Sequence, residues 1–123
     1  MIRGIVIAEH EAIIQVSLRG PKSRVLHVEA VVDTGFSGHL SLPPAIVAQL
    51  RLQWDRSGEV ILADARESAV EIYDGTVLWD GRSLSIPVQE VDANPLVGMA
   101  LLEGYELNVQ VRPGGKVVIK PLA

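Results

Sequence analysis

Apolar and polar residues alternate along much of this chain, which is the period of a β-strand with one buried face. In residues 11–19 the apolar positions form one face: Ala12, Ile14, Val16 and Leu18. A second strand is expected over residues 25–32, after a turn that Gly and Pro indicate at residues 20–23. The end of this strand, Val31-Val32, is apolar on both faces, so we expect it to enter the core.

Turn signals divide the second half of the chain into hairpins. The predicted strands are 60–62 and 69–73 around a polar tip at 64–68, 76–79 and 84–88 around Asp80-Gly81, and 107–111 and 117–119 around Pro113-Gly114-Gly115. Two short helices are expected, at residues 45–50 after Pro43-Pro44 and at 99–102 before Gly104. The pattern predicts a compact, mainly β fold that is mostly antiparallel. At 123 residues, we expect one domain spanning residues 1–123.

Composition narrows the class of protein. The chain is 48% hydrophobic and 21% charged, which is typical of a globular protein. Its net charge of −4 and scattered basic residues argue against nucleic acid or an anionic membrane as the main partner. It has no cysteine, which excludes disulfides, thiolate catalysis and zinc–thiolate sites. No apolar run approaches the ~20 residues that span a bilayer, and no signal peptide is evident, so we expect a cytoplasmic protein.

The candidate chemistry lies around Asp33, which follows two β-branched residues and precedes Thr34-Gly35-Phe36-Ser37-Gly38. A buried carboxylate is costly, so it is found where it has partners or a function. Gly35 and Gly38 let another group approach the acid, and the hydroxyl of Thr34 can form a hydrogen bond. Alone, this triplet more often indicates an Asx turn. A second segment, Leu96-Val97-Gly98 before the expected helix at 99–102, favours chemistry instead.

Together the two segments resemble the retropepsin-like aspartic proteases. In that family Asp–Thr–Gly ends a buried strand, and two apolar residues, a glycine and a short helix follow tens of residues later. Asp33-Thr34-Gly35 matches the first element and Leu96-Val97-Gly98 the second. The resemblance covers about residues 10–120 and looks strongest to the stand-alone bacterial and archaeal members, in which Asp–Thr–Gly–Phe precedes Ser or Thr and Gly. It implies a closed antiparallel β-barrel with one lobe per chain.

The resemblance also implies an aspartic endopeptidase that acts on peptides or proteins without a metal or other cofactor. The chain holds a single Asp–Thr–Gly, so the active enzyme would be a homodimer in which each subunit supplies Asp33. Thr34 would hydrogen-bond across the dimer, Gly35 would lie beside the substrate, and Ser37 and Gly38 would support the loop. The strands within 107–119 are the expected interface. The residues expected to contact substrate, on a flap and on apolar walls, are Ala30, Asp64, Ala65, Arg66 and Val97.

Two positions depart from the family pattern. Phe36 stands where retroviral members have Ala and pepsin-like members have Ser or Thr. Support for the outer oxygen of the aspartate is therefore absent or comes from Ser37. The expected flap tip, 64–67, lacks the usual glycine, which indicates a stiffer flap or a tip displaced along the sequence.

Other interpretations involve different residues or a different class of function. His10, His27 and His39 match no metal-ligand spacing, and we expect structural roles for them. Ser37 and Ser41 lack the local signature of a nucleophile. The alternative function is a catalytically inactive or partner-dependent dimeric interaction module on the same fold, and a small-molecule-binding barrel is a third. The Asp–Thr–Gly favours the enzyme, because a binding module has no reason to bring two acids together.

Overall fold

The computed structural model describes residues 1–22 and 24–123, and Ser23 of the predicted turn at 20–23 lies outside the described residues. The elements, in chain order, are β1 (Ile2–Val6), β2 (Ala12–Arg19), β3 (Val25–Val32), β4 (Leu40–Leu42), α1 (Pro44–Leu50), β5 (Gln53–Ile61), β6 (Glu67–Trp79), β7 (Arg82–Glu90), β8 (Leu96–Val97), α2 (Met99–Leu102), β9 (Tyr105–Val109) and β10 (Lys116–Pro121). The mainly β prediction is confirmed. Within the described ranges, no helix is long and apolar enough to cross a membrane.

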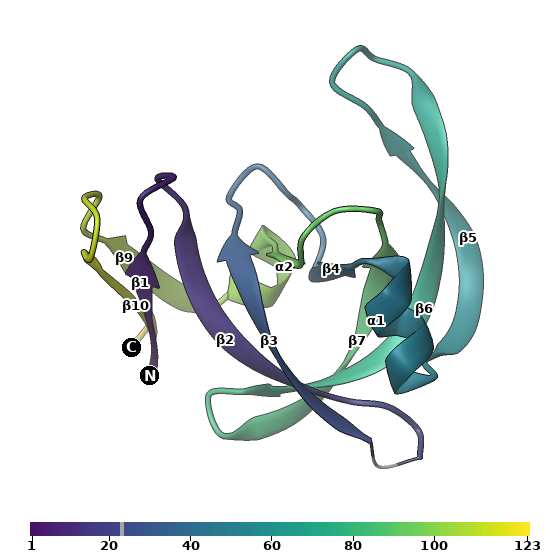
Figure 1. The fold of residues 1–123 in the computed structure, drawn as a ribbon, viewed down its shortest axis with the longest axis horizontal. Coiled ribbons are helices and arrows are strands. Elements are labelled where there is room, and N and C mark those ends of the chain that lie inside the picture. Colours follow the sequence, from purple (N-terminus) through teal and green to yellow (C-terminus); the bar gives the residue numbers. More distant parts are fainter. Residues whose placement is uncertain (23) are drawn as a thin grey trace.

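Six strands close into a ring. They follow the order β6-β7-β4-β8-β3-β2, and an additional pairing of β2 with β6, which includes Ser17 opposite Leu78, completes the circle (Figure 1). Two of the pairings in the ring, β3 with β8 and β4 with β7, are parallel, and the others are antiparallel. The predicted barrel is therefore confirmed, with two parallel contacts that the strand pattern did not indicate.

The core of the barrel fixes the strands that carry the candidate site. Leu40, Val77 and Val97 have no exposed surface, and the alternating apolar residues of β2 point inward with them. Burying each such side chain stabilises the fold by about 1.5–3 kcal/mol. Because β4 and β8 lie between β3 and β7, this core holds their short backbones in place.

Helix α1 begins and ends as the sequence predicts. Pro44 occupies its first turn, where a missing N–H costs nothing. It ends at Arg51, whose φ of 52° is left-handed and whose backbone N–H bonds back to the helix. Val47 and Leu50 are buried, and Ile46 packs against the same core.

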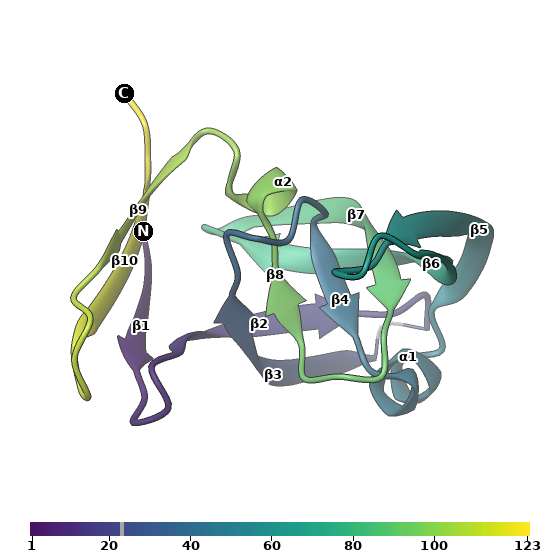
Figure 2. The same cartoon turned by 90° about the horizontal axis from the view of Figure 1, so that it is seen from above.

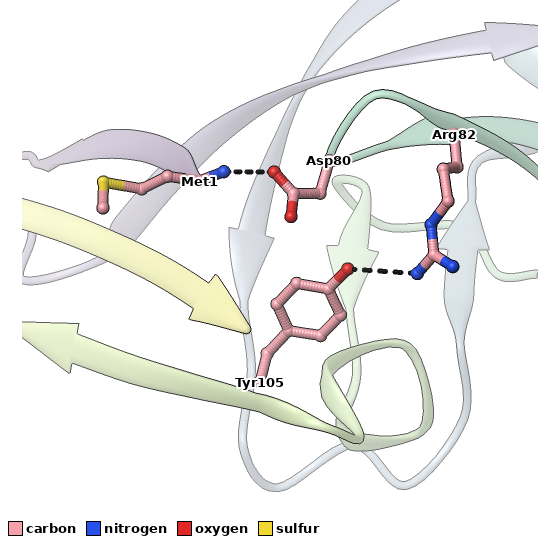
Figure 3. A network of polar contacts seen from close by, with 4 residues as sticks. All are labelled: Met1, Asp80, Arg82 and Tyr105. Atoms are coloured by element: carbon pink, nitrogen blue, oxygen red, sulfur yellow. Dashed lines mark hydrogen bonds and ion pairs between the residues drawn. The ribbon is translucent and has the colours of Figure 1, made fainter. Parts of the chain in front are cut away.

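The terminal strands form a layer beside the ring. β1 pairs with both β2 and β10, and β10 pairs with β9 (Figure 2). The β6–β7 turn anchors this layer to the barrel: the Met1 amino group contacts Asp80, and Arg82 donates to the Tyr105 hydroxyl (Figure 3). The ring of Tyr105 also packs edge-on against buried Trp79, with centroids 6.0 Å apart. The terminal strands are thus attached to the barrel in two places, through the pairing of β1 with β2 and at the β6–β7 turn.

Candidate active site

Asp33 directly follows β3, at the point where the chain leaves the ring. Its backbone N–H donates to the carbonyl of Val97 at 2.9 Å, which continues the parallel pairing of β3 with β8. Its Oδ1 accepts the backbone N–H of Gly35 at 2.8 Å, and its carbonyl accepts the N–H of Phe36 at 3.1 Å. This is an Asx turn, the local structure that the triplet Asp33-Thr34-Gly35 indicates when it is considered alone. The turn fixes the carboxylate while leaving Oδ2 without a partner among the described residues.

The loop after Asp33 packs against Gly98 at the start of α2. The N–H of Gly98 donates to the carbonyl of His39 at 3.0 Å, and the N–H of Met99 donates to the carbonyl of Phe36 at 2.8 Å. The ring of Phe36 occupies the space that the side chains of Gly38 and Gly98 would need, since a Cβ on either glycine would lie 2.6 Å from a ring carbon. Phe36 therefore holds the loop that follows Asp33 against the segment Leu96-Val97-Gly98.

A cavity of about 360 Å³ opens beside the carboxylate. It is lined by Asp33 and Thr34, by Glu11 and His10 of the β1–β2 turn, and by apolar residues of several strands. Val109 and Val111, at and after the end of β9, contribute to the same lining. Asp33 thus lies in a hollow that combines an acid with aliphatic walls, as ligand sites commonly do.

The β5–β6 hairpin rises above the ring on the side where the β3–β4 loop lies (Figure 1). Its tip, residues 62–66, is closed by a hydrogen bond from the N–H of Leu62 to the carbonyl of Arg66 at 2.8 Å. Asp64 accepts bonds from the backbone N–H and the Nε of Arg66. Ala65 has a φ of 66°, a left-handed conformation that costs a residue other than glycine about 1–2 kcal/mol. The tip is therefore shaped by Asp64 and Arg66, and Ala65 stands where a glycine would fit.

Comparisons with known proteins address the fold. No protein-family model matches the sequence, and no curated protein matches it. Among solved structures, EIAV protease complexed with the inhibitor HBY-793 matches with a TM-score of 0.57 and 17% identity, over 78% of this chain and 88% of that one. A retropepsin-like aspartic protease from Rickettsia conorii matches with a TM-score of 0.58 and 16% identity, over 99% and 91%. This chain has a retropepsin-like fold. The retropepsin-like fold that the two sequence segments led us to expect is therefore confirmed.

The retropepsin-like fold brings some of the predicted residues together and separates others. Thr34, Gly35 and Ser37 are exposed on the loop beside Asp33, and Gly38 lies beneath Phe36. Ala30 and Val97, expected as walls facing substrate, are 1% and 0% exposed, so in one chain their side chains belong to the core under the loop. Asp64, Ala65 and Arg66 are at the tip of the β5–β6 hairpin, the segment for which a flap role is expected.

Two of the three histidines have surroundings that bear on the site. His27 is exposed on β3, where its Nδ1 is 2.7 Å from the hydroxyl of Ser17. His10 shares the cavity with Asp33, which the sequence did not predict. Glu11, Val109 and Val111 were also missed as neighbours of Asp33, because no local motif marks them and only the tertiary fold brings them there. In residues 1–22 and 24–123, no group of three or more potential ligands could hold a metal ion.

The base of the β5–β6 hairpin carries a polar cross-link between its strands. Glu71 on β6 accepts hydrogen bonds from the Nε1 of Trp54 at 2.5 Å and from the hydroxyl of Ser57 at 2.8 Å, both on β5. These bonds, led by the one from Trp54, lower the pKa of Glu71 below its ordinary value. Burial, followed by the charge of Glu90, raises the pKa of neighbouring Tyr73. Ionised Glu71 therefore stabilises the hairpin where its two strands join the barrel.

Glu71→Gln is expected to destabilise the protein in a pH-dependent way. Because folding lowers the pKa of Glu71, its contribution is present above the ordinary value of 4.5 and is lost as the pH falls through the folded value. The difference in unfolding midpoint between wild type and Glu71→Gln should thus be largest near neutral pH and disappear in acid. Denaturant unfolding across this pH range measures it. Glu67→Gln, which removes an exposed carboxylate from the same strand, is the control, and equal pH profiles for the two variants would contradict the cross-link.

Proposed function

We propose that this chain is an aspartic endopeptidase that acts as a homodimer, with residues 1–123 as one cytoplasmic protease domain. The observation that carries the proposal is the anchoring of Asp33: its backbone is tied to Val97 and its Oδ1 to Gly35, while the carboxylate lies in a cavity. The retropepsin-like fold and the hairpin above the same side of the ring support it.

The chemistry needs a second carboxylate, and the partner's Asp33 is the natural source. Two carboxylates about 3 Å apart cannot both ionise readily, so they share a proton and titrate as a coupled pair. The ionised member takes a proton from a bound water, and the protonated member donates to the scissile carbonyl. Water attacks, a tetrahedral diol forms, and the two roles reverse as the amide bond breaks. The flap would close over an extended peptide and exclude bulk water.

The position of the terminal strands supports a dimer of this kind. In the described part of the chain, β1 is paired on both sides, whereas β9 pairs only with β10 and leaves one edge open. Val109 and Val111 at the end of β9 line the same cavity as Asp33 and Thr34, and Val111 is 72% exposed. A second copy that covered this edge would therefore lie next to the catalytic loop, as the expected interface at 107–119 requires.

Cleavage of a diverse peptide mixture at mildly acidic and neutral pH tests the function. Purified protein is incubated with the mixture, and the products are identified by mass spectrometry. We expect internal cleavage with a shared side-chain preference around the cut bonds. A mixture that stays intact at every pH, with the protein dimeric, would contradict the peptidase and favour the interaction module.

Thr34→Val is expected to weaken the dimer about 10-fold or more. Thr34 is exposed in one chain, and the proposed dimer buries its hydroxyl in a hydrogen bond between subunits. Valine keeps the shape and removes that bond, and the loss occurs twice in a two-fold dimer. Sedimentation equilibrium measures the change, and Thr34→Ser, which retains the hydroxyl, is the matched control. An unchanged dissociation constant for Thr34→Val would remove this role.

A further inference from the structure

The cavity beside Asp33 has long aliphatic walls and a second carboxylate. Valines of β1, β3 and β9 line it together with Leu96, and Glu11 lines it from the β1–β2 turn. The turn is held by backbone bonds between Ile7 and Glu11 at 3.0 Å and between His10 and Ile7 at 3.0 Å. The position of Glu11 relative to the cavity is therefore set by the fold of the turn.

Glu11 is half-buried, and its carboxylate has no hydrogen bond or ion pair with any residue that the structure describes. A partly desolvated carboxylate is costly without a compensating cation or donor. No lysine or arginine of the described ranges lines the cavity, and His10 is the sole basic residue there. A lysine or arginine that pairs with Glu11 in this cavity would therefore come from another molecule.

We infer that Glu11 makes this cavity a pocket for a basic side chain, lysine or arginine, of the substrate. The inference rests on the proposed peptidase function, of which it defines the substrate class. The methylene stem of such a side chain would lie against the valines, while its charged head would pair with Glu11. In a two-fold dimer the pocket occurs twice, once on each side of the scissile bond. A basic residue is therefore expected to be favoured on either side of the cut.

The test uses two matched sets of peptides at pH 7.5, with lysine or norleucine next to the bond that the wild type cuts. One set is cleavable, and the other carries a hydroxyethylene group in place of that bond, so that binding is measured without catalysis. We expect the wild type to favour lysine over norleucine about 10-fold or more, both in kcat/KM and in affinity, as a charge-assisted contact predicts. Glu11→Gln should bring the ratio of lysine to norleucine close to one, both in kcat/KM and in affinity. Glu9→Gln, which removes an exposed charge from the same turn, should keep it.

Each other outcome overturns the inference in a distinguishable way. Cleavage of both peptides with no preference for lysine would refute the basic pocket and leave the peptidase standing. If Glu11→Gln keeps the preference for lysine, then other residues cause that preference. A Glu11→Gln variant with a weakened dimer and unaltered selectivity would show that Glu11 pairs with the second subunit instead. Failure of the wild type to cut or bind any peptide would overturn the pocket and the proposed function together.

Discussion

Asp33→Asn is expected to abolish peptide cleavage while the protein remains folded. Asparagine has the shape of aspartate, and its Oδ1 can still accept the N–H of Gly35 that closes the turn. It cannot take up or release the shared proton, so both the activation of water and the protonation of the scissile carbonyl are lost. General acid–base catalysis contributes about 10²–10⁴-fold for one group, and the substitution affects both subunits. We therefore expect kcat/KM to fall by at least about 10³-fold.

The measurement compares wild type, Asp33→Asn and Asp74→Asn on the same peptides, with unfolding and sedimentation as checks on the fold and the dimer. Asp74 is exposed on β6 and serves as a control for the loss of one negative charge. Asp74→Asn should retain full activity. An Asp33→Asn protein that still cleaves would show that Asp33 is not the catalyst.

Mixing the two proteins shows whether each subunit supplies one aspartate. If dimers exchange at random, equal amounts of wild type and Asp33→Asn place about one quarter of all dimers in the fully wild-type form. Activity per wild-type chain should then fall to about half, and it should fall further as the variant is added in excess. Activity per wild-type chain that does not change on mixing would indicate that one chain works alone.

The sequence predicts local structure well where the alternation of apolar and polar residues extends over enough positions to be recognised. The alternation in 12–19 and 25–32, the Pro-led helix and the Asp80-Gly81 turn all appear as expected, and Asp80 and Gly81 have φ values of 50° and 82° that suit a tight hairpin. β4 and β8 were missed because three and two residues show no period. Their parallel pairings depend on contacts distant in sequence, which no local pattern encodes.

Glycines were a second source of error. Asp74-Gly75 separates two of the predicted strands, yet β6 runs through it without a break. A Cβ on Gly75 would lie 2.8 Å from Cγ2 of Val88, so this glycine serves close packing inside the barrel, not a turn. A family resemblance linked two distant segments of the sequence, and in the structure Asp33 of the first bonds to Val97 of the second. The cavity was not anticipated, since its lining comes from the β1–β2 turn and the end of β9.

The same close packing makes Gly98→Ala the second change with a large expected effect. A Cβ on Gly98 would lie 2.6 Å from Cδ2 and 2.8 Å from the carbonyl oxygen of Phe36, and it would also overlap the carbonyl of Gly38. Those two carbonyls accept the N–H groups of Met99 and Ala100 at 2.8 and 3.1 Å, so the methyl group cannot be accommodated without moving the loop from α2.

Overpacking of this kind costs about 1–3 kcal/mol, and a shift of about 1 Å in a catalytic group can reduce the rate about 10²-fold. We expect Gly98→Ala to lower both the unfolding midpoint and kcat/KM. Gly81→Ala is the control, because its left-handed φ of 82° makes alanine costly although no atom lies within 4 Å of the new methyl group. Both variants should lose stability, but only Gly98→Ala should lose activity at a temperature where both are folded. If Gly98→Ala cleaves as fast as Gly81→Ala, then the contact between Phe36 and Gly98 does not position Asp33, and the anchoring of the carboxylate rests on Val97 and Gly35 alone.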